Sequence, residues 1–137
     1  MKTSLNILCV DDHPDTVNLL RFSLEMQGHN VWTATTSNEA ISLIQQREFD
    51  LYILDIRVPD SDGFDMCREI RARKVFTPII IFSASASDSD KQAALDAGAT
   101  MYVPKPEGLE TILSVASVMW NSFLAKENAK RNATTSE

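Results

Sequence analysis

The sequence predicts a doubly wound α/β domain, in which a parallel sheet carries helices on both faces. Two observations lead to this fold class. Short apolar runs alternate five times with longer stretches of helical spacing, and residues 7–10 and 79–81 are apolar at every position. Strands that are buried on both faces of a parallel sheet have such continuous apolar runs. The chain has 137 residues, which suits one domain at roughly 100–200 residues per domain.

The apolar runs predict five strands. In chain order, they cover residues 5–10, 30–34, 51–54, 78–82 and 101–103. The second run is the weakest, whereas the fourth contains three consecutive β-branched isoleucines. The segment 58–63, which is dense in turn-forming residues, separates the third strand from the helix that follows it.

Apolar residues at steps of three and four predict five helices. In chain order, they cover residues 14–27, 37–47, 64–73, 88–97 and 109–124. Pro14 suits a first helical turn, and Gly28 suits the end of that helix. Ser37 can cap the second helix, and Ser87 or Asp88 can cap the fourth.

The last predicted helix has a broad apolar stripe, which is continued by residues outside the main face. The stripe consists of Leu109, Ile112, Leu113, Ala116, Met119, Trp120 and Phe123. Val115 and Val118 widen it, either as edge packing or as part of a partner surface. From Ala125 the chain becomes polar. We therefore expect a domain over residues 1–124 and a frayed or disordered polar tail or linker over residues 125–137.

Composition excludes several functional classes. The net charge is −6, from 13 Lys and Arg against 19 Asp and Glu, whereas nucleic-acid surfaces need clustered cations. The longest apolar runs fall short of the roughly 18 residues that span a bilayer, and residues 1–6 lack a secretory signal. Cys9 and Cys67 lie among apolar neighbours, so we predict buried free thiols. These features predict a cytoplasmic protein without nucleic-acid or membrane partners.

Polar side chains follow four of the predicted strands. Asp11 and Asp12 follow the first, Asp55 the third, Ser83 the fourth and Lys105 the fifth. In a doubly wound sheet, the carboxyl ends of the strands line the edge where ligands bind. Packed carboxylates repel one another unless a cation joins them, and Mg²⁺ prefers such oxygen ligands together with water and phosphate. The sequence therefore predicts a magnesium site at this edge.

This set of side chains suits transfer of a phosphoryl group to a carboxylate. A carboxylate can act as a covalent nucleophile that forms an aspartyl-phosphate, and it has no proton to lose. Mg²⁺, an ammonium group and a small hydroxyl would neutralise charge on the phosphoryl oxygens. We interpret His13 as a loop residue, because neither it nor His29 has a second soft ligand at zinc-site spacing. No second base is evident in the sequence, which favours transient self-modification over rapid turnover of an external substrate.

Over residues 5–123 the sequence resembles the receiver domain of two-component response regulators, of the chemotaxis-regulator type. The matching segments are Val10-Asp11-Asp12, Asp55-Ile56-Arg57-Val58-Pro59-Asp60-Ser61-Asp62-Gly63, Ser83-Ala84, Ala97-Gly98-Ala99, and Tyr102 with Lys105-Pro106. Each segment is a weak signal alone, but together they occur in order and at receiver spacing. The resemblance implies a flavodoxin-like sheet with strand order 2-1-3-4-5.

The resemblance implies a role for each acidic residue at the strand ends. Asp55 would be the phospho-acceptor. Asp12 and Asp55 would bind Mg²⁺ directly, and Asp11 would act mainly through water. The backbone carbonyl of Arg57 would complete the protein ligands.

The remaining residues are implied to act on the phosphoryl group and on the output. Ser83 would hydrogen-bond a phosphoryl oxygen, and Lys105 would pair first with the acceptor and then with the phosphoryl group. The Lys105–Pro106 bond is a candidate for the cis form. Movement of Ser83 would let Tyr102 turn inward and change the surface of the fourth helix, fifth strand and fifth helix.

The resemblance also implies partners. The phosphodonor would be a sensor histidine kinase or a histidine phosphotransfer domain. A downstream effector, or a second copy in a homodimer, would bind the changed surface preferentially in one conformation.

Three residues depart from the common receiver pattern. Pro104 removes a backbone donor immediately before Lys105. Glu107 stands where a hydrophobic residue commonly follows Lys-Pro, which alters a usual partner surface. Arg57 is a long cation at a variable position of the site entrance, where it would either shield the phosphoryl group or guide water towards it.

Three alternative functions can be compared with this one. A magnesium-dependent phosphohydrolase of the haloacid type would present Asp-x-Asp, whereas Asp55-Ile56-Arg57 lacks the second acid. A flavin-binding protein would need a neutral phosphate loop after the first strand, where Asp11 and Asp12 would repel the flavin phosphate. A receiver-like binding module without phosphorylation would not need the complete set of acids, hydroxyl and lysine.

Overall fold

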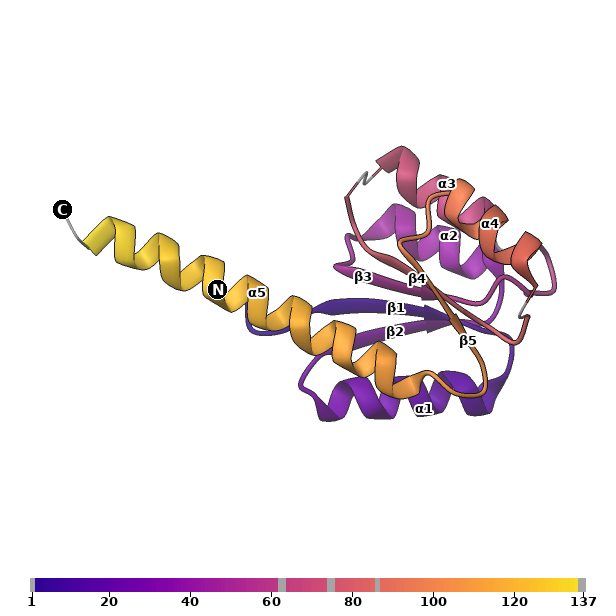
Figure 1. The fold of residues 1–137 in the computed structure, drawn as a ribbon, viewed down its shortest axis with the longest axis horizontal. Coiled ribbons are helices and arrows are strands. Elements are labelled where there is room, and N and C mark those ends of the chain that lie inside the picture. The colour runs from indigo at the N-terminus through magenta and orange to yellow at the C-terminus, as the bar shows by residue number, and fades with distance from the viewer. Residues whose placement is uncertain (1, 62–63, 74–75, 86, 136–137) are drawn as a thin grey trace.

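The computed structural model describes residues 2–61, 64–73, 76–85 and 87–135, which form a parallel sheet between two layers of helices (Figure 1). The strands are β1 (Asn6–Val10), β2 (Asn30–Ala34), β3 (Leu51–Leu54), β4 (Ile79–Ser83) and β5 (Met101–Pro104). The helices are α1 (Pro14–Met26), α2 (Ser37–Gln46), α3 (Phe64–Arg73), α4 (Asp88–Asp96) and α5 (Leu109–Thr135). The strand order is β2-β1-β3-β4-β5, and every neighbouring pair is parallel. The predicted fold class and strand order are confirmed.

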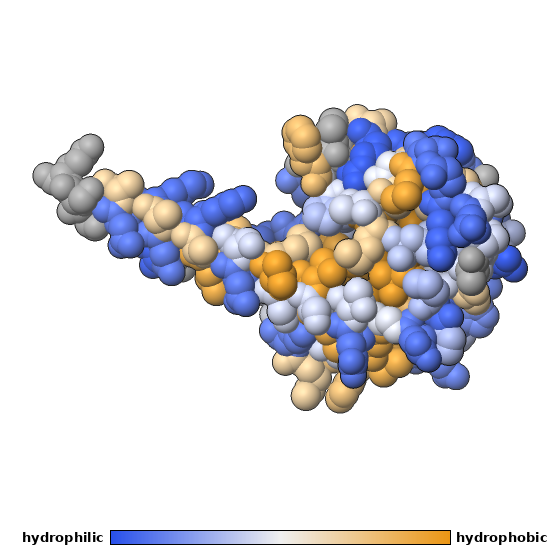
Figure 2. Space-filling view, viewed as in Figure 1, coloured by the Kyte–Doolittle hydropathy of each residue, from blue (hydrophilic) through white to orange (hydrophobic). Residues whose placement is uncertain are grey.

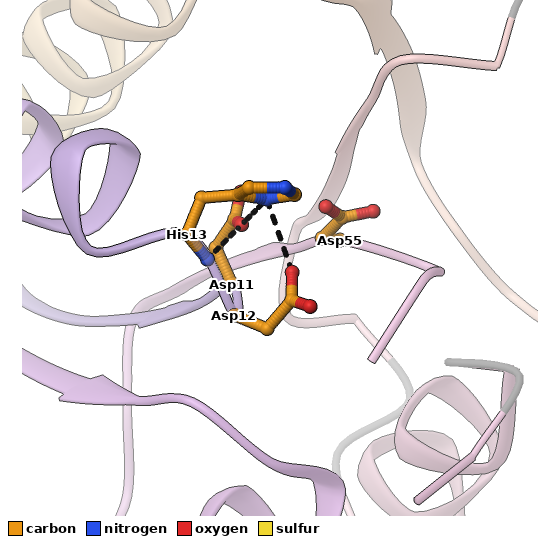
Figure 3. Close-up of side chains that lie close together, drawn as sticks. All are labelled: Asp11, Asp12, His13 and Asp55. Carbon is orange, nitrogen blue, oxygen red and sulfur yellow. Dashed lines mark hydrogen bonds and ion pairs between the residues drawn. The ribbon is translucent and has the colours of Figure 1, made fainter. Parts of the chain in front are cut away.

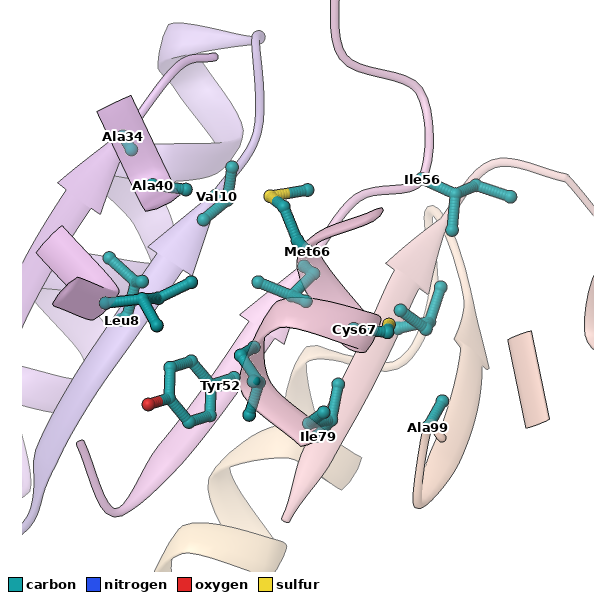
Figure 4. Packing of buried hydrophobic residues seen from close by; sticks show 14 of the residues in the cluster. Leu8, Val10, Ala34, Ala40, Tyr52, Ile56, Met66, Cys67, Ile79 and Ala99 are labelled. Carbon is teal, nitrogen blue, oxygen red and sulfur yellow. The ribbon is translucent and has the colours of Figure 1, made fainter. Parts of the chain in front are cut away.

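The helices cover the two faces of the sheet unequally. Helices α1 and α5 lie on one face, and α2, α3 and α4 lie on the other (Figure 1). Alternation along β1 divides its side chains between two cores, since successive residues of a strand point to opposite faces. Leu8 and Val10 join the α2–α4 core (Figure 4), whereas Ile7 and Cys9 join the α1–α5 core. The fully apolar strands are thereby buried on both sides.

The two cysteines are buried free thiols, as predicted from their neighbours. Cys9 lies in the α1–α5 core and Cys67 in the α2–α4 core. Burial raises the pKa of the Cys9 thiol to about 12, so this group stays protonated and unreactive at neutral pH.

The helix caps differ from prediction in one place. Ser87 caps α4, and its side chain accepts a hydrogen bond from the backbone of Asp90. Of the two alternatives predicted for this cap, Ser87 and Asp88, the first is confirmed. The cap of α2 is Thr36, whose side chain accepts from the backbone of Glu39. Ser37 instead lies inside the first turn and is buried. The prediction placed the cap one residue too late because both neighbours carry a hydroxyl.

Helix α5 continues well beyond its predicted end. It runs to Thr135, whereas the sequence predicted an end at Leu124 and a frayed or disordered tail from Ala125. The distal residues project from the body as a largely polar stalk (Figure 2). They are mostly good helix formers, and Glu127 pairs with Lys130 one turn away at 3.8 Å. The polar composition of the segment from Ala125 therefore indicated that it is exposed to solvent, but it did not indicate whether the segment is helical or disordered.

Among the described residues, no helix is both long enough and apolar enough to span a bilayer.

Candidate functional site

The ends of β1 and β3 bring two aspartates together at the carboxyl edge of the sheet. The hydrogen-bond ladder of the parallel sheet continues one residue past the ends of β1 and β3. The Asp11 N–H donates to the Ala34 carbonyl at 3.1 Å, and the Asp55 N–H donates to the Val10 carbonyl at 2.8 Å. Both aspartates are almost fully buried, with 2% and 3% of their surface exposed. Buried carboxylates require partners, because desolvation disfavours their charged form.

Lys105 supplies the positive charge between these carboxylates. Its ammonium group donates to Asp55 Oδ2 at 3.0 Å and also to Asp11 Oδ2. Burial by itself lowers the pKa of Lys105, but the hydrogen bonds and charges of Asp11 and Asp55 outweigh burial and raise it. Lys105 therefore remains an ammonium ion that holds the two carboxylates in one site.

The loop that carries Lys105 is held by its backbone. The Lys105 N–H donates to the Ser83 carbonyl at 2.8 Å, and the Lys105–Pro106 bond is cis. Gly108 ends the loop with φ of +117°, and a Cβ at this position would lie 2.3 Å from Val103 Cγ1. Only glycine fits this entry into α5 without displacing its neighbours.

His13 lies closer to the acidic cluster than its interpretation as a loop residue implied. Its backbone N–H donates to Asp11 Oδ1 at 2.9 Å, which turns the chain back over the end of β1. The ring nitrogen Nδ1 then lies 2.9 Å from Asp11 Oδ1 and 3.0 Å from Asp12 Oδ1 (Figure 3). The hydrogen bond to Asp11, followed by the charge of Asp12, raises the pKa of His13. The sequence signal for this contact is the Asx-turn spacing from Asp11 to His13.

The acidic residues form a group that could hold a metal ion. Asp11, Asp12, His13 and Asp55 each offer one ligand atom, and these atoms lie within 4.8 Å of one another. The group contains three carboxylates, and Lys105 contacts two of them, Asp11 and Asp55, so the negative charge of the acids exceeds the charge of this ammonium. Oxygen-rich sites favour hard cations such as Mg²⁺ over zinc or copper. The donor set therefore fits the predicted magnesium ion.

The segment after Asp55 forms one wall of an open cleft. The Arg57 N–H donates to Asp55 Oδ1 at 2.9 Å, so both oxygens of Asp55 have partners. The cleft has a volume of about 540 Å³ and is lined by Asp12, Ile56, Arg57, Val58, Pro59, Ser61, Phe64 and Asp90. Asp90 was not predicted, because it belongs to α4 and reaches the cleft only through packing. Asp62 and Gly63, which belong to the motif, lie outside the described residues.

The two predicted switch residues lie beside the loop that follows β4. Ser83 is fully buried, and its hydroxyl oxygen lies 3.5 Å from the backbone nitrogen of Ser85. The partly buried Tyr102 donates its phenolic hydrogen to the Ser85 carbonyl at 2.9 Å. Ser85 therefore contacts both Ser83 and Tyr102.

Fold and site together define a receiver domain, the phosphorylation-based signalling switch of two-component systems. The model of the response regulator receiver domain family matches residues 7–117. The chain belongs to this family.

Solved receiver domains have the same architecture. The chain is 26% identical to the BeF3-activated DrrB receiver domain, over 87% of this chain and 99% of that one, with a TM-score of 0.79. For the chemotaxis response regulator CheY4 of Vibrio cholerae, identity is 31%, coverage 82% and 96%, and the TM-score 0.77. The non-phosphorylated HemR receiver domain of Leptospira biflexa is 32% identical, over 80% of this chain and 89% of that one, with a TM-score of 0.74.

Proposed function

We propose that this receiver domain takes a phosphoryl group onto Asp55 in a magnesium-dependent reaction. The phosphodonor is a phosphohistidine of a sensor histidine kinase or of a histidine phosphotransfer domain in the cytoplasm. The observation that carries the proposal is the buried contact of Lys105 with both Asp55 and Asp11, beside the exposed Asp12. This arrangement combines a nucleophile, a fixed cation and an excess of oxygen ligands.

In the proposed transfer, a carboxylate oxygen of Asp55 attacks phosphorus as the bond from phosphorus to the imidazole nitrogen breaks. The imidazole leaves with the electron pair of that bond, and an acyl phosphate forms. Lys105 already contacts the Asp55 oxygen at 3.0 Å and would follow the new negative charge. The buried Ser83 hydroxyl would then donate to a phosphoryl oxygen. Positioning and charge neutralisation are the main requirements of such a transfer.

The proposed metal ligands are Asp12, Asp55 and the carbonyl of Arg57, with Asp11 acting through water. A bound Mg²⁺ supplies neutralisation of the phosphoryl oxygens. Asp11 is fully engaged with His13 and Lys105, which supports its indirect role. Asp12 is the most exposed of the three acids and faces the cleft.

The proposed output is a change of the surface formed by α4, β5 and α5. Tyr102 and Ser83 both contact Ser85, so movement of Ser83 towards the phosphoryl group would alter the surroundings of Tyr102. An effector, or a second copy of the chain in a homodimer, would bind one state in preference to the other. Because the similar DrrB receiver domain is activated by BeF3, the same phosphoryl mimic can be used to test whether this surface changes in the present chain.

Incubation with Mg²⁺ and a small-molecule phosphodonor, followed by intact-mass analysis, tests the acceptor. We expect the wild type to gain one phosphoryl group and Asp55→Asn to gain none. Asp65→Asn is the matched control, because Asp65 is an exposed acid of α3 and should leave labelling intact. Equal labelling of Asp55→Asn would reject the acceptor assignment. Many turnovers of a phosphate ester per chain would instead favour a phosphohydrolase.

A further inference from the structure

Asp60 connects the loop after the phospho-acceptor to a different helix. Its two carboxylate oxygens accept hydrogen bonds from the backbone of α2, at 2.8 Å from Ser37 and 2.9 Å from Asn38. Thr36 already accepts from the next free N–H, that of Glu39. Thr36 and Asp60 thus divide the free N–H groups of the first turn of α2, which would otherwise lack partners.

The segment from Asp55 to Asp60 is consequently held at both ends. At its start, Asp55 Oδ1 accepts from the Arg57 N–H at 2.9 Å. In its middle, Val58 is buried in the α2–α4 core and pairs with Ser61 in a short bridge. At its far end, the exposed Asp60 is anchored by its two hydrogen bonds with α2. The Arg57 carbonyl lies between these anchors.

We propose that Asp60 is a positioning residue for the metal site, acting through the backbone of α2 to hold the Arg57 carbonyl in place. This inference rests on the proposed function, in which that carbonyl is a magnesium ligand. Mg²⁺ requires near-ideal octahedral geometry at about 2.0–2.1 Å, so a small displacement of one oxygen weakens binding. Groups that orient metal ligands commonly change metal affinity by about 10–100-fold when removed.

The chemistry of the contact suits a permanent anchor. A carboxylate at a helix N-terminus is favoured by the helix dipole as well as by the two hydrogen bonds. The N–H groups of Ser37 and Asn38 lower the pKa of Asp60, so its charge is retained at neutral pH. An asparagine would keep one acceptor oxygen but would lose the second bond and the charge.

Calorimetric titration of the full chain with Mg²⁺ tests the proposal. We expect the dissociation constant for Mg²⁺ to rise about tenfold in Asp60→Ala and by a smaller factor in Asp60→Asn. Asp65→Ala is the matched control, because it removes an exposed acid nearby whose partner is the surface residue Arg68. Its affinity should stay within about twofold of the wild type. Asp60→Asn keeps the size of the side chain and covers the case in which Asp60→Ala fails to fold.

A kinetic measurement separates positioning from general damage to the fold. The rate of phosphorylation by a small-molecule donor is measured as a function of Mg²⁺ concentration. We expect the Asp60 variants to need more Mg²⁺ for half-maximal rate and to reach the wild-type rate at saturation. If Asp60→Ala and Asp60→Asn match Asp65→Ala in Mg²⁺ affinity, the inference is wrong although the proposed function stands. If the wild type binds no Mg²⁺, both fail.

Discussion

The carboxyl edge of the sheet and the distal part of α5 are both rich in charge, but they use it differently. At the sheet edge, Asp11 and Asp55 are buried and share the Lys105 ammonium. On the distal helix, Glu127 and Lys130 are exposed and lie 3.8 Å apart. Water screens the second pair and is largely excluded from the first. Burial therefore decides which charges have large energetic and chemical effects.

The largest effect is expected from Lys105→Met, which leaves the two buried carboxylates without their cation. We expect the free energy of unfolding at neutral pH, measured by urea denaturation in EDTA, to fall by about 4 kcal/mol. Added Mg²⁺ should restore part of this loss, because it replaces the missing positive charge. Lys130→Met is the exposed control. A loss in Lys105→Met no larger than in that control would contradict the comparison.

The second prediction contrasts two positions of α5. Ile112 is fully buried in the α1–α5 core, whereas Val118 is 64% exposed. Ile112→Ala should lower the free energy of unfolding by about 3 kcal/mol, since it removes buried methyl groups and leaves a cavity. Val118→Ala should change it by less than about 0.5 kcal/mol. Similar losses in thermal and urea unfolding of both variants would show that the outer face of α5 is covered in solution.

The third prediction concerns the two histidines, whose pKa values shift in opposite directions. The contacts with Asp11 and Asp12 raise the pKa of His13 above its usual 6.5. The resulting stabilisation is complete below pH 6.5 and is lost as the pH rises through the raised folded-state value. In metal-free buffer, His13→Gln should remove this pH dependence from urea unfolding. An unchanged pH profile in His13→Gln would show that the ring does not contact the acids in solution.

His29 provides the internal comparison. Burial lowers its pKa below 6.5, and its Nδ1 accepts a hydrogen bond from the Leu5 N–H at 3.2 Å. Here stability should fall as the pH drops below 6.5, because the unfolded chain binds the proton more readily. His29→Gln should reduce this loss on the acid side and leave the His13 effect in place.

The smallest effect is expected from the distal helix. Lys130→Ala removes the exposed pair with Glu127 and should change the free energy of unfolding by about 0.3 kcal/mol. Added salt should shrink this difference further, because the pair is in contact with solvent. A loss above about 1 kcal/mol would place the distal segment among buried rather than exposed elements.

Much of the site could be anticipated because its residues directly follow buried strands. Asp11, Asp55 and Lys105 occupy one edge of the sheet, as expected from their places in the sequence. The sequence did not indicate the contacts of His13 with the acids or of Asp60 with the backbone of α2. Both residues contact backbone N–H groups or use their own: His13 forms an Asx turn with Asp11, and Asp60 caps a helix that is distant in sequence. Residue patterns seldom predict such contacts.

The periodicity of apolar residues was sufficient for the five strands, the approximate places of the five helices and the buried thiols, because burial on both faces demands uninterrupted apolar strands. The strand order was implied by the resemblance to receiver domains. The partners of each charge needed the folded chain. Lys105 meets Asp11 across 94 residues, and Asp60 meets Ser37 across 23. The full length of α5 also emerged only in three dimensions. Contacts between charged groups far apart in sequence depend on the conformation of the loops and on which groups lose water on folding. The local spacing of residues predicts neither of these properties.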